Sequence, residues 1–201
     1  MTWITTIPYA QATGRLRRLY DRIKGPDDVI DNIMLAHSLR PHSMEGHMAL
    51  YKHVLHNGAN RTPEWLREAV GLYVSLLNGC AYCVAHHFEG VRRLLGDDVR
   101  AEAIRAALVA DEPARALDAT GTAVMAYARA LTRDPAGLTE AAIAALRAAG
   151  LDDGEILEIN QVVAYFAYAN RTVLGLGVST EGDRLGLSPG TSDNPHDWAH
   201  G

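Results

Sequence analysis

The two cysteines of this 201-residue chain lie close together, in the segment Cys80-Ala81-Tyr82-Cys83, and two histidines follow at positions 86 and 87. On a helix, residues three apart are neighbours on one face, so the Cα atoms of Cys80 and Cys83 fall in the range that a disulfide spans. A disulfide across so short a loop removes little entropy from the unfolded chain and adds little stability. The spacing therefore favours a redox-active dithiol over a structural disulfide.

Two further residues are placed to move protons to or from this pair. His87 follows Cys83 by four residues and shares its helical face, which favours a role in proton transfer. Glu68 stands at the edge of an apolar helical run, where a carboxylate needs a partner. After the break at Asn78-Gly79 the next helix is predicted to begin near Cys80, where the helix dipole lowers a thiol pKa.

A metal site is the main alternative for these residues. Zinc motifs usually supply two separated ligand pairs, whereas the two cysteines and two histidines here crowd into one and a half helical turns. Covalent haem attachment needs a histidine directly after the second cysteine, where Val84 stands. No metal is predicted. Five further histidines lie upstream at spacings that form no common face: His37, His42, His47, His53 and His56.

Apolar residues recur at helical spacing along most of the chain, and no segment has the pattern of a strand. Thr62 is a candidate N-cap, with Pro63 at the first helical position. The pattern predicts one all-α domain over residues 1–178. The predicted helices span residues 9–24, 29–39, 44–55, 63–78, 80–95, 98–110, 113–133, 140–150 and 155–177.

Residues 179–201 are rich in Gly, Ser, Asp and Pro and are predicted to form an extended C-terminal tail. Such a segment has too few apolar residues to fold by itself. We expect Leu185, Leu187 or Trp198 to attach the tail to a neighbouring subunit.

The overall composition is that of a soluble globular protein, with 48% hydrophobic and 21% charged residues. A net charge of -5 provides no basic surface for nucleic acid or an anionic membrane. The N-terminus carries Arg15, Arg17 and Arg18 without a long apolar run, so neither a signal peptide nor a membrane span is predicted. We therefore expect a cytoplasmic protein, in which structural disulfides are rare.

The pattern Glu-x11-Cys-x2-Cys-x3-His, within VSLLNGCAYCVAHH, resembles the motif of the alkylhydroperoxidase D-like family in the carboxymuconolactone decarboxylase superfamily. The segment 75–83 is most similar to the branch called peroxidase-related proteins. A weaker likeness extends from about Ile7 to about Gly177. Tyr82 departs from the pattern, because the best-described members have a histidine before the second cysteine.

This resemblance implies an alkylhydroperoxidase D-like multi-helix bundle that assembles as a homo-oligomer, a trimer or a hexamer. It also implies a thiol-dependent peroxidase without a bound cofactor, restored by an external thiol or protein reductant. In this scheme His87, polarised by Glu68, takes a proton so that Cys83 attacks the peroxide as a thiolate. Cys80 then closes the disulfide.

Tyr82 and His86 are possible supporting residues. The Tyr82 hydroxyl is expected either to pack between helices or to bond near the thiols, and His86 to be structural or to face solvent. Two alternatives to the peroxidase remain open: a carboxymuconolactone decarboxylase-like lyase, which does not need the cysteines, and a non-enzymatic redox-sensing oligomer.

Overall fold

The computed structural model describes residues 2–201, which form α-helices and short 3-10 helices and contain no β-sheet. The prediction of an all-α fold is therefore confirmed. No helix in this part of the chain combines the length and apolar character needed to cross a membrane. The α-helices are α1 (Gly14–Ile23), α2 (Asn32–Ala36), α3 (Pro41–Leu55), α4 (Glu64–Leu77), α5 (Ala81–Leu95), α6 (Asp98–Val109), α7 (Ala119–Arg133), α8 (Glu140–Ala148) and α9 (Asp153–Leu176).

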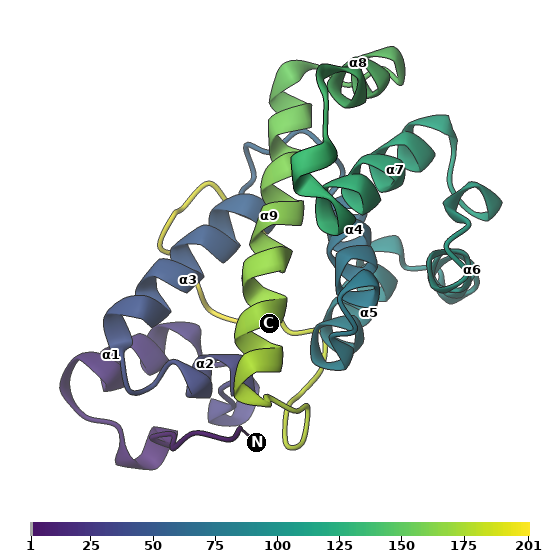
Figure 1. Cartoon of the computed structure of the whole chain (residues 1–201). Coiled ribbons are helices and arrows are strands. Elements are labelled where there is room, and N and C mark those ends of the chain that lie inside the picture. The colour runs from purple at the N-terminus through teal and green to yellow at the C-terminus, as the bar shows by residue number, and fades with distance from the viewer. Residues whose placement is uncertain (1) are drawn as a thin grey trace.

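The long helix α9 runs through the middle of the molecule, with α3 on one side and α4 and α5 on the other (Figure 1). Helix α7 also packs on α4 and α9, and α6 packs on α5. Helices α1 and α2 lie at the end of the molecule where α9 finishes, and α8 lies at the opposite end (Figure 1). The cysteine-bearing helix α5 is thus held mainly by α4.

Helix α4 is apolar nearly all round and is buried continuously from Leu66 to Ser75, as expected for a helix in the core. Its close approach to α9 depends on Gly71, because a Cβ atom at this position would overlap the ring of Phe166. The ring of Phe166 is fully buried. A glycine in α4 therefore makes room for an aromatic side chain of α9.

Several helix ends follow from local capping. Asp152 and Glu155 form a capping box at the start of α9. Asp118 caps α7 by accepting a hydrogen bond from the Gly121 backbone N–H, so the predicted helix 113–133 is interrupted before residue 119. The predicted helix 9–24 likewise divides into a 3-10 turn, Tyr9–Gln11, and α1.

The prediction that Thr62 caps α4 is wrong. Pro63 is the N-cap residue of this helix, and it makes no side-chain capping bond. The Thr62 hydroxyl instead donates to a carboxylate oxygen of Glu158 in α9, 2.7 Å away. Thr62 therefore connects the loop before α4 to α9.

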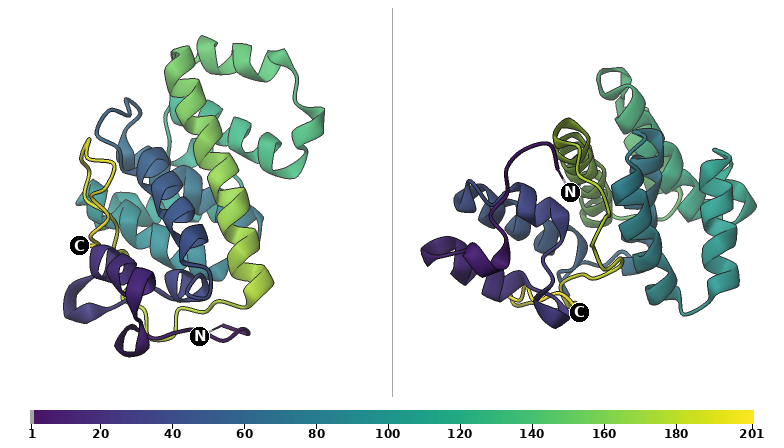
Figure 2. Two further views of the ribbon diagram at one scale, coloured as in Figure 1. Left: turned by 90° about the vertical axis from the view of Figure 1, so that its left-hand side faces the viewer. Right: turned by 90° about the horizontal axis from the view of Figure 1, so that it is seen from below.

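The C-terminal tail folds back over the N-terminal half of its own chain (Figure 2). Lys52 donates to the Gly190 carbonyl, and Arg93 donates to the Gly201 carbonyl at 2.8 Å. Trp198 is buried beneath the guanidinium of Arg22, which lies 3.9 Å from the ring centroid. Trp198 thus has its partner within the same chain rather than on the neighbouring subunit that the sequence suggested.

Replacing Gly71 by Ala should destabilise the protein by about 1–3 kcal/mol, because overpacking in a rigid core typically costs this much. Gly46 in α3 is the matched control, since it is exposed and a Cβ there meets no atom within 4 Å. Gly46→Ala should stabilise the protein by about 0.5–1 kcal/mol. Denaturant unfolding measures both changes, and equal effects would contradict the close approach of α4 to α9.

Candidate active site

Glu68 of α4 and His87 of α5 form a buried hydrogen-bonded pair, with 2.7 Å between Glu68 Oε2 and His87 Nδ1. Burial alone would raise the pKa of Glu68, but the charge and hydrogen bond of His87 hold it below its usual value. The carboxylate is therefore ionised and accepts the bond, so the hydrogen lies on His87 Nδ1. In the neutral imidazole Nε2 is then left free to accept a proton.

Gly90 allows this pair to form. It lies three residues after His87 on the same face of α5, and a Cβ atom there would come within 2.9 Å of Glu68 Oε2. Any larger residue would therefore push the carboxylate away. Nothing in the sequence distinguished Gly90 as a site residue, because its role depends on how α4 packs against α5.

His56, at the end of α3, extends the pair into a chain of four groups. Its Nδ1 lies 2.7 Å from Glu64 Oε1, and its Nε2 lies 3.5 Å from Glu68 Oε1. Burial would raise the pKa of Glu64, yet hydrogen bonds from His56 and Thr191 hold it below its usual value. The sequence analysis placed His56 among the scattered histidines and missed this role, because a turn between helices brings it here.

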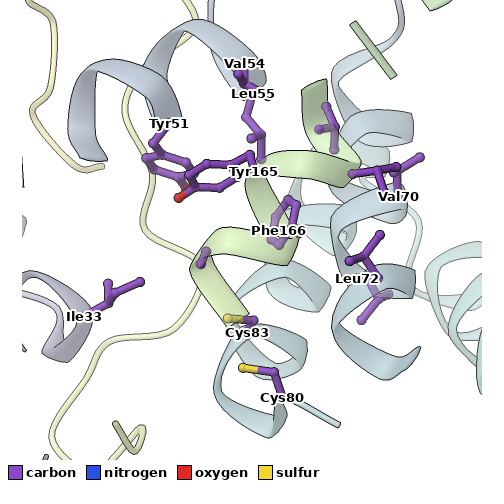
Figure 3. Packing of buried hydrophobic residues seen from close by; sticks show 14 of the residues in the cluster. Ile33, Tyr51, Val54, Leu55, Val70, Leu72, Cys80, Cys83, Tyr165 and Phe166 are labelled. Atoms are coloured by element: carbon purple, nitrogen blue, oxygen red, sulfur yellow. The ribbon is translucent and has the colours of Figure 1, made fainter. Parts of the chain in front are cut away.

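Cys80 and Cys83 are both free and buried at the start of α5, where Cys80 is the N-cap residue. Their sulfur atoms point to the same side of the helix (Figure 3). The hydrogen bond from the Cys83 side chain lowers the pKa of the Cys80 thiol, and the backbone N–H groups of Cys83 and Tyr82 add to this effect. The same shared bond, with burial, raises the pKa of Cys83 well above its usual value.

The directions of these two shifts favour Cys80 over Cys83 as the site of the first negative charge. The predicted lowering of a thiol pKa at the start of this helix thus applies to Cys80, although the bond from Cys83 is its largest cause. This resting state differs from the peroxidase scheme, in which Cys83 is the thiolate. Because the two sulfurs share one proton, their titration belongs to the pair rather than to either cysteine.

Asn170 of α9 supplies hydrogen-bond donors beside the sulfurs. This fully buried side chain donates to Ser75 Oγ at 3.0 Å, and it accepts from the Asn78 amide at 2.9 Å. Its amide lowers the pKa of both cysteines, although it is not the largest influence on either. The sequence analysis did not include Asn170 in the site.

A cavity of about 40 Å³ adjoins Cys83, His87 and Glu68. Cys80 is fully buried and does not line it. Access from the cavity thus favours Cys83 as the reacting sulfur, whereas the resting charge lies on Cys80. The wall also includes aromatic and histidine side chains from other elements: His47 and Tyr51 of α3, Tyr165 of α9 and His200 of the tail.

Tyr82 and His86 are held by a carboxylate from the tail. The Tyr82 hydroxyl donates to Asp183 Oδ2 at 2.8 Å and accepts from the Ile33 backbone N–H at 3.2 Å. His86 Nε2 lies 3.2 Å from the same Asp183 oxygen, and His86 is buried, so the alternative that it faces solvent is wrong. Both residues line the cavity, and both are held by partners that the sequence did not predict.

Residues 41–134, which include α3 to α7, match the sequence profile of the carboxymuconolactone decarboxylase family. This segment is a carboxymuconolactone decarboxylase family domain. The family resemblance drawn from the cysteine motif is thereby confirmed. A search of curated protein sequences finds no significant match.

Several solved structures share the fold of this chain. A peroxidase-related protein from Silicibacter sp. TM1040 is 24% identical with a TM-score of 0.75, covering 89% of this chain and 91% of its own. A peroxidase-related protein from Ralstonia eutropha JMP134, described as an alkylhydroperoxidase core, is 19% identical with a TM-score of 0.74 and the same coverage. The chain thus has an alkylhydroperoxidase D-like helical fold.

A third similar structure is a debrominase, a cysteine-to-alanine variant in complex with 2,3,4-tribromopyrrole. It is 18% identical with a TM-score of 0.70, and the match covers 90% of this chain and 93% of the debrominase. The same helical arrangement therefore occurs in proteins described by different chemistry.

Replacing Asn170 by the similarly shaped Leu should raise the pKa of the thiol pair, because a donor that stabilises the thiolate is lost. The ultraviolet absorbance of the thiolate, followed against pH, measures this shift. Asn160→Leu is the control, since Asn160 lies in the same helix but donates to Tyr127 at 2.7 Å. An equal shift in both variants would show that Asn170 acts only through general stability.

Proposed function

We propose that this protein is a thiol-dependent peroxidase that reduces hydroperoxides with the two electrons of the Cys80 and Cys83 thiols. One observation carries the proposal: Cys83 lines a small cavity together with the hydrogen-bonded pair of Glu68 and His87. A nucleophile beside an oriented base is the arrangement that activates a thiol. The similarity to two peroxidase-related structures supports it.

The proton steps follow from the state of the thiol pair. The pair releases one proton to His87 Nε2, the ring nitrogen left free because Nδ1 donates to Glu68. The retained proton lies on Cys83 at rest and moves to Cys80 when Cys83 attacks. His87 therefore sets the fraction of thiol pairs that have lost one proton. Transfer of the retained proton along the bond between the sulfurs moves the negative charge from Cys80 to Cys83, the sulfur that meets the peroxide.

The electron steps are those of a dithiol peroxidase. The Cys83 thiolate attacks one peroxide oxygen, the O–O bond breaks, and the second oxygen leaves as an alcohol or water after protonation. Cys80 then attacks the Cys83 sulfenic acid, which releases water and forms the disulfide. An external thiol or a protein dithiol reduces this disulfide and completes the cycle.

Reductive dehalogenation is a second candidate, favoured by the similarity to the debrominase structure. Removal of a halogen as halide consumes the same two thiol electrons, so the dithiol alone does not distinguish the two reactions. The cavity of about 40 Å³ favours a small peroxide over a polyhalogenated ring. A decarboxylase-like lyase would not need the two cysteines. In a redox sensor the cysteines would be oxidised once, without catalytic turnover.

We also propose that the protein works as a homo-oligomer, a trimer or a hexamer. Large apolar side chains that remain uncovered on the single chain support this assembly, because exposed apolar surface of this kind marks contact regions. The most exposed are Trp3, Val99, Val109 and Leu157.

The two cysteines should respond differently to substitution. Cys83→Ser should abolish peroxide consumption, because the remaining Cys80 is not accessible from the cavity. Cys80→Ser should still form one sulfenic acid per chain, since Cys83 keeps its access and a serine suits the N-cap position. Dimedone labelling after stoichiometric peroxide measures the product, and a label found only on Cys80 would reverse the roles.

Glu68→Gln and His87→Gln should each lower the rate with peroxide by about 10²- to 10⁴-fold, the usual contribution of an acid–base group. The double variant should be little slower than either single variant, because the two residues act as one unit. Disulfide formation by a strong oxidant should survive in all three. Turnover rates that stay at the wild-type level across the pH range would assign both residues a purely structural role.

A further inference from the structure

Asp31 brings a second carboxyl group to the cavity beside Cys83, from the loop before α2. Its Oδ1 atom is buried and has no hydrogen-bond partner among residues 2–201. Nor does the side chain cap α2, although Asp31 is the N-cap residue of that helix. Buried polar atoms are nearly always paired, so an unpaired oxygen in a cavity wall indicates a missing partner.

A second unpaired polar atom lies in the same wall. His47 of α3 is almost completely buried, and its Nδ1 has no partner within the described chain, while its Nε2 lies 3.5 Å from the Tyr165 hydroxyl. Burial lowers the pKa of His47 to about 3, so the ring stays neutral. Two unpaired polar atoms from separate elements thus line a small cavity with room for a few water molecules. A hydroperoxide group, with its donor and its acceptor oxygens, has the size and polarity to satisfy them.

The charges around Asp31 favour its acid form. Burial raises the pKa of Asp31 to about 7, the nearby His86 opposes this rise, and the negative Asp183 adds to it. Tyr82 and Tyr51 also lie near enough to interact with the Asp31 charge, whereas Glu68, His87 and His200 share the cavity wall. At neutral pH a large fraction of Asp31 therefore carries a proton that it can donate.

The pKa values of the two carboxyl groups that line this cavity are thus shifted in opposite directions. The pKa of Glu68 lies below its usual value because His87 and His56 compensate for burial, whereas that of Asp31 lies above because its burial is not compensated. Opposite shifts of this kind separate the base side of a catalytic site from the acid side. The thiol pair gives its proton to His87, the partner of Glu68. Asp31 is therefore the carboxyl group that remains available to protonate the peroxide.

We propose that Asp31 is a further catalytic residue, which binds the departing oxygen of the peroxide and protonates it. This inference rests on the proposed peroxidase function. As Cys83 attacks and the O–O bond breaks, the electron pair of that bond goes to the departing oxygen. The proton of the Asp31 carboxyl group goes to the same oxygen, so that an alcohol or water leaves and Asp31 becomes a carboxylate. Solvent returns the proton to Asp31 before the next cycle.

The test compares two small peroxides that differ in their leaving group. Hydrogen peroxide must lose hydroxide or water and needs an acid, whereas peracetic acid loses acetate, which is stable without a proton. With hydrogen peroxide, Asp31→Asn should slow single-turnover oxidation of Cys83 by about 10²-fold or more. With undissociated peracetic acid at mildly acidic pH, the rate of Cys83 oxidation in the same variant should fall by less than about tenfold. The ratio of the two losses does not depend on the fraction of folded protein, because both are measured on one sample.

The pH dependence provides a second readout. With hydrogen peroxide, the rate of the wild type divided by that of Asp31→Asn should fall toward one as the pH rises through about 7. The ratio falls because Asp31 of the wild type loses its proton above this pH and can no longer act as a donor. Ionisation of the substrate and of the thiols affects both proteins, so it cancels in the ratio. Asp27→Asn, at an exposed position in the 3-10 turn Pro26–Asp28 shortly before Asp31, is the matched control and should leave both rates unchanged.

Three results would overturn the proposal. Equal losses with the two peroxides would mean that Asp31 only shapes the cavity, and an unchanged rate with hydrogen peroxide would mean that another group supplies the proton. If wild-type protein with a reducible dithiol reacts with neither peroxide, the peroxidase function itself fails, and the role of Asp31 fails with it.

Discussion

The burial of an ionised carboxylate, Glu68, is the constraint on which the rest of the site depends. A charge removed from water is tolerated only when hydrogen-bonded partners compensate, and removing one partner of such a buried pair typically costs about 3–5 kcal/mol. Here His87 bonds one carboxylate oxygen and His56 approaches the other from the end of α3. Gly90 leaves the space in which the carboxylate lies against α5. One charge therefore fixes the relative positions of three helices.

This arrangement orients the base independently of the groups that stabilise the thiolate. His87 is held with Nδ1 toward Glu68, so its other nitrogen is the one available for chemistry. The thiolate is stabilised separately, first by the Cys83 thiol and then by the backbone N–H groups at the start of α5 and the Asn170 amide of α9. The base thus depends on the α4–α5 contact, whereas the sulfur pair depends on a helix end and on α9.

The tail makes the site more enclosed than the helices alone would. Gly186, Leu187, Ser188 and His200 all contribute to the cavity wall, and Asp183 fixes both Tyr82 and His86. The tail therefore forms part of the wall around Cys83. The helical frame is shared with proteins described as peroxidase-related and with a debrominase, so the frame alone does not define a substrate.

Local patterns in the sequence determined the helices and the central motif. Apolar spacing, Asp caps and breaks at Gly and Pro set most helix positions, and helical periodicity placed Cys80 and Cys83 on one face. These features depend on neighbours within a few residues, so the sequence was sufficient. It failed where a nearby cap competes, as at Asp118, which interrupts a helix that looked continuous.

Only the tertiary structure decided the partners of the motif: His56 and Gly90 at the carboxylate, Asn170 at the sulfurs, and Asp183 and Asp31 at the cavity. These contacts join positions far apart in the chain, and burial changes the pKa values of the groups involved. Neither effect leaves a periodic signal in the sequence.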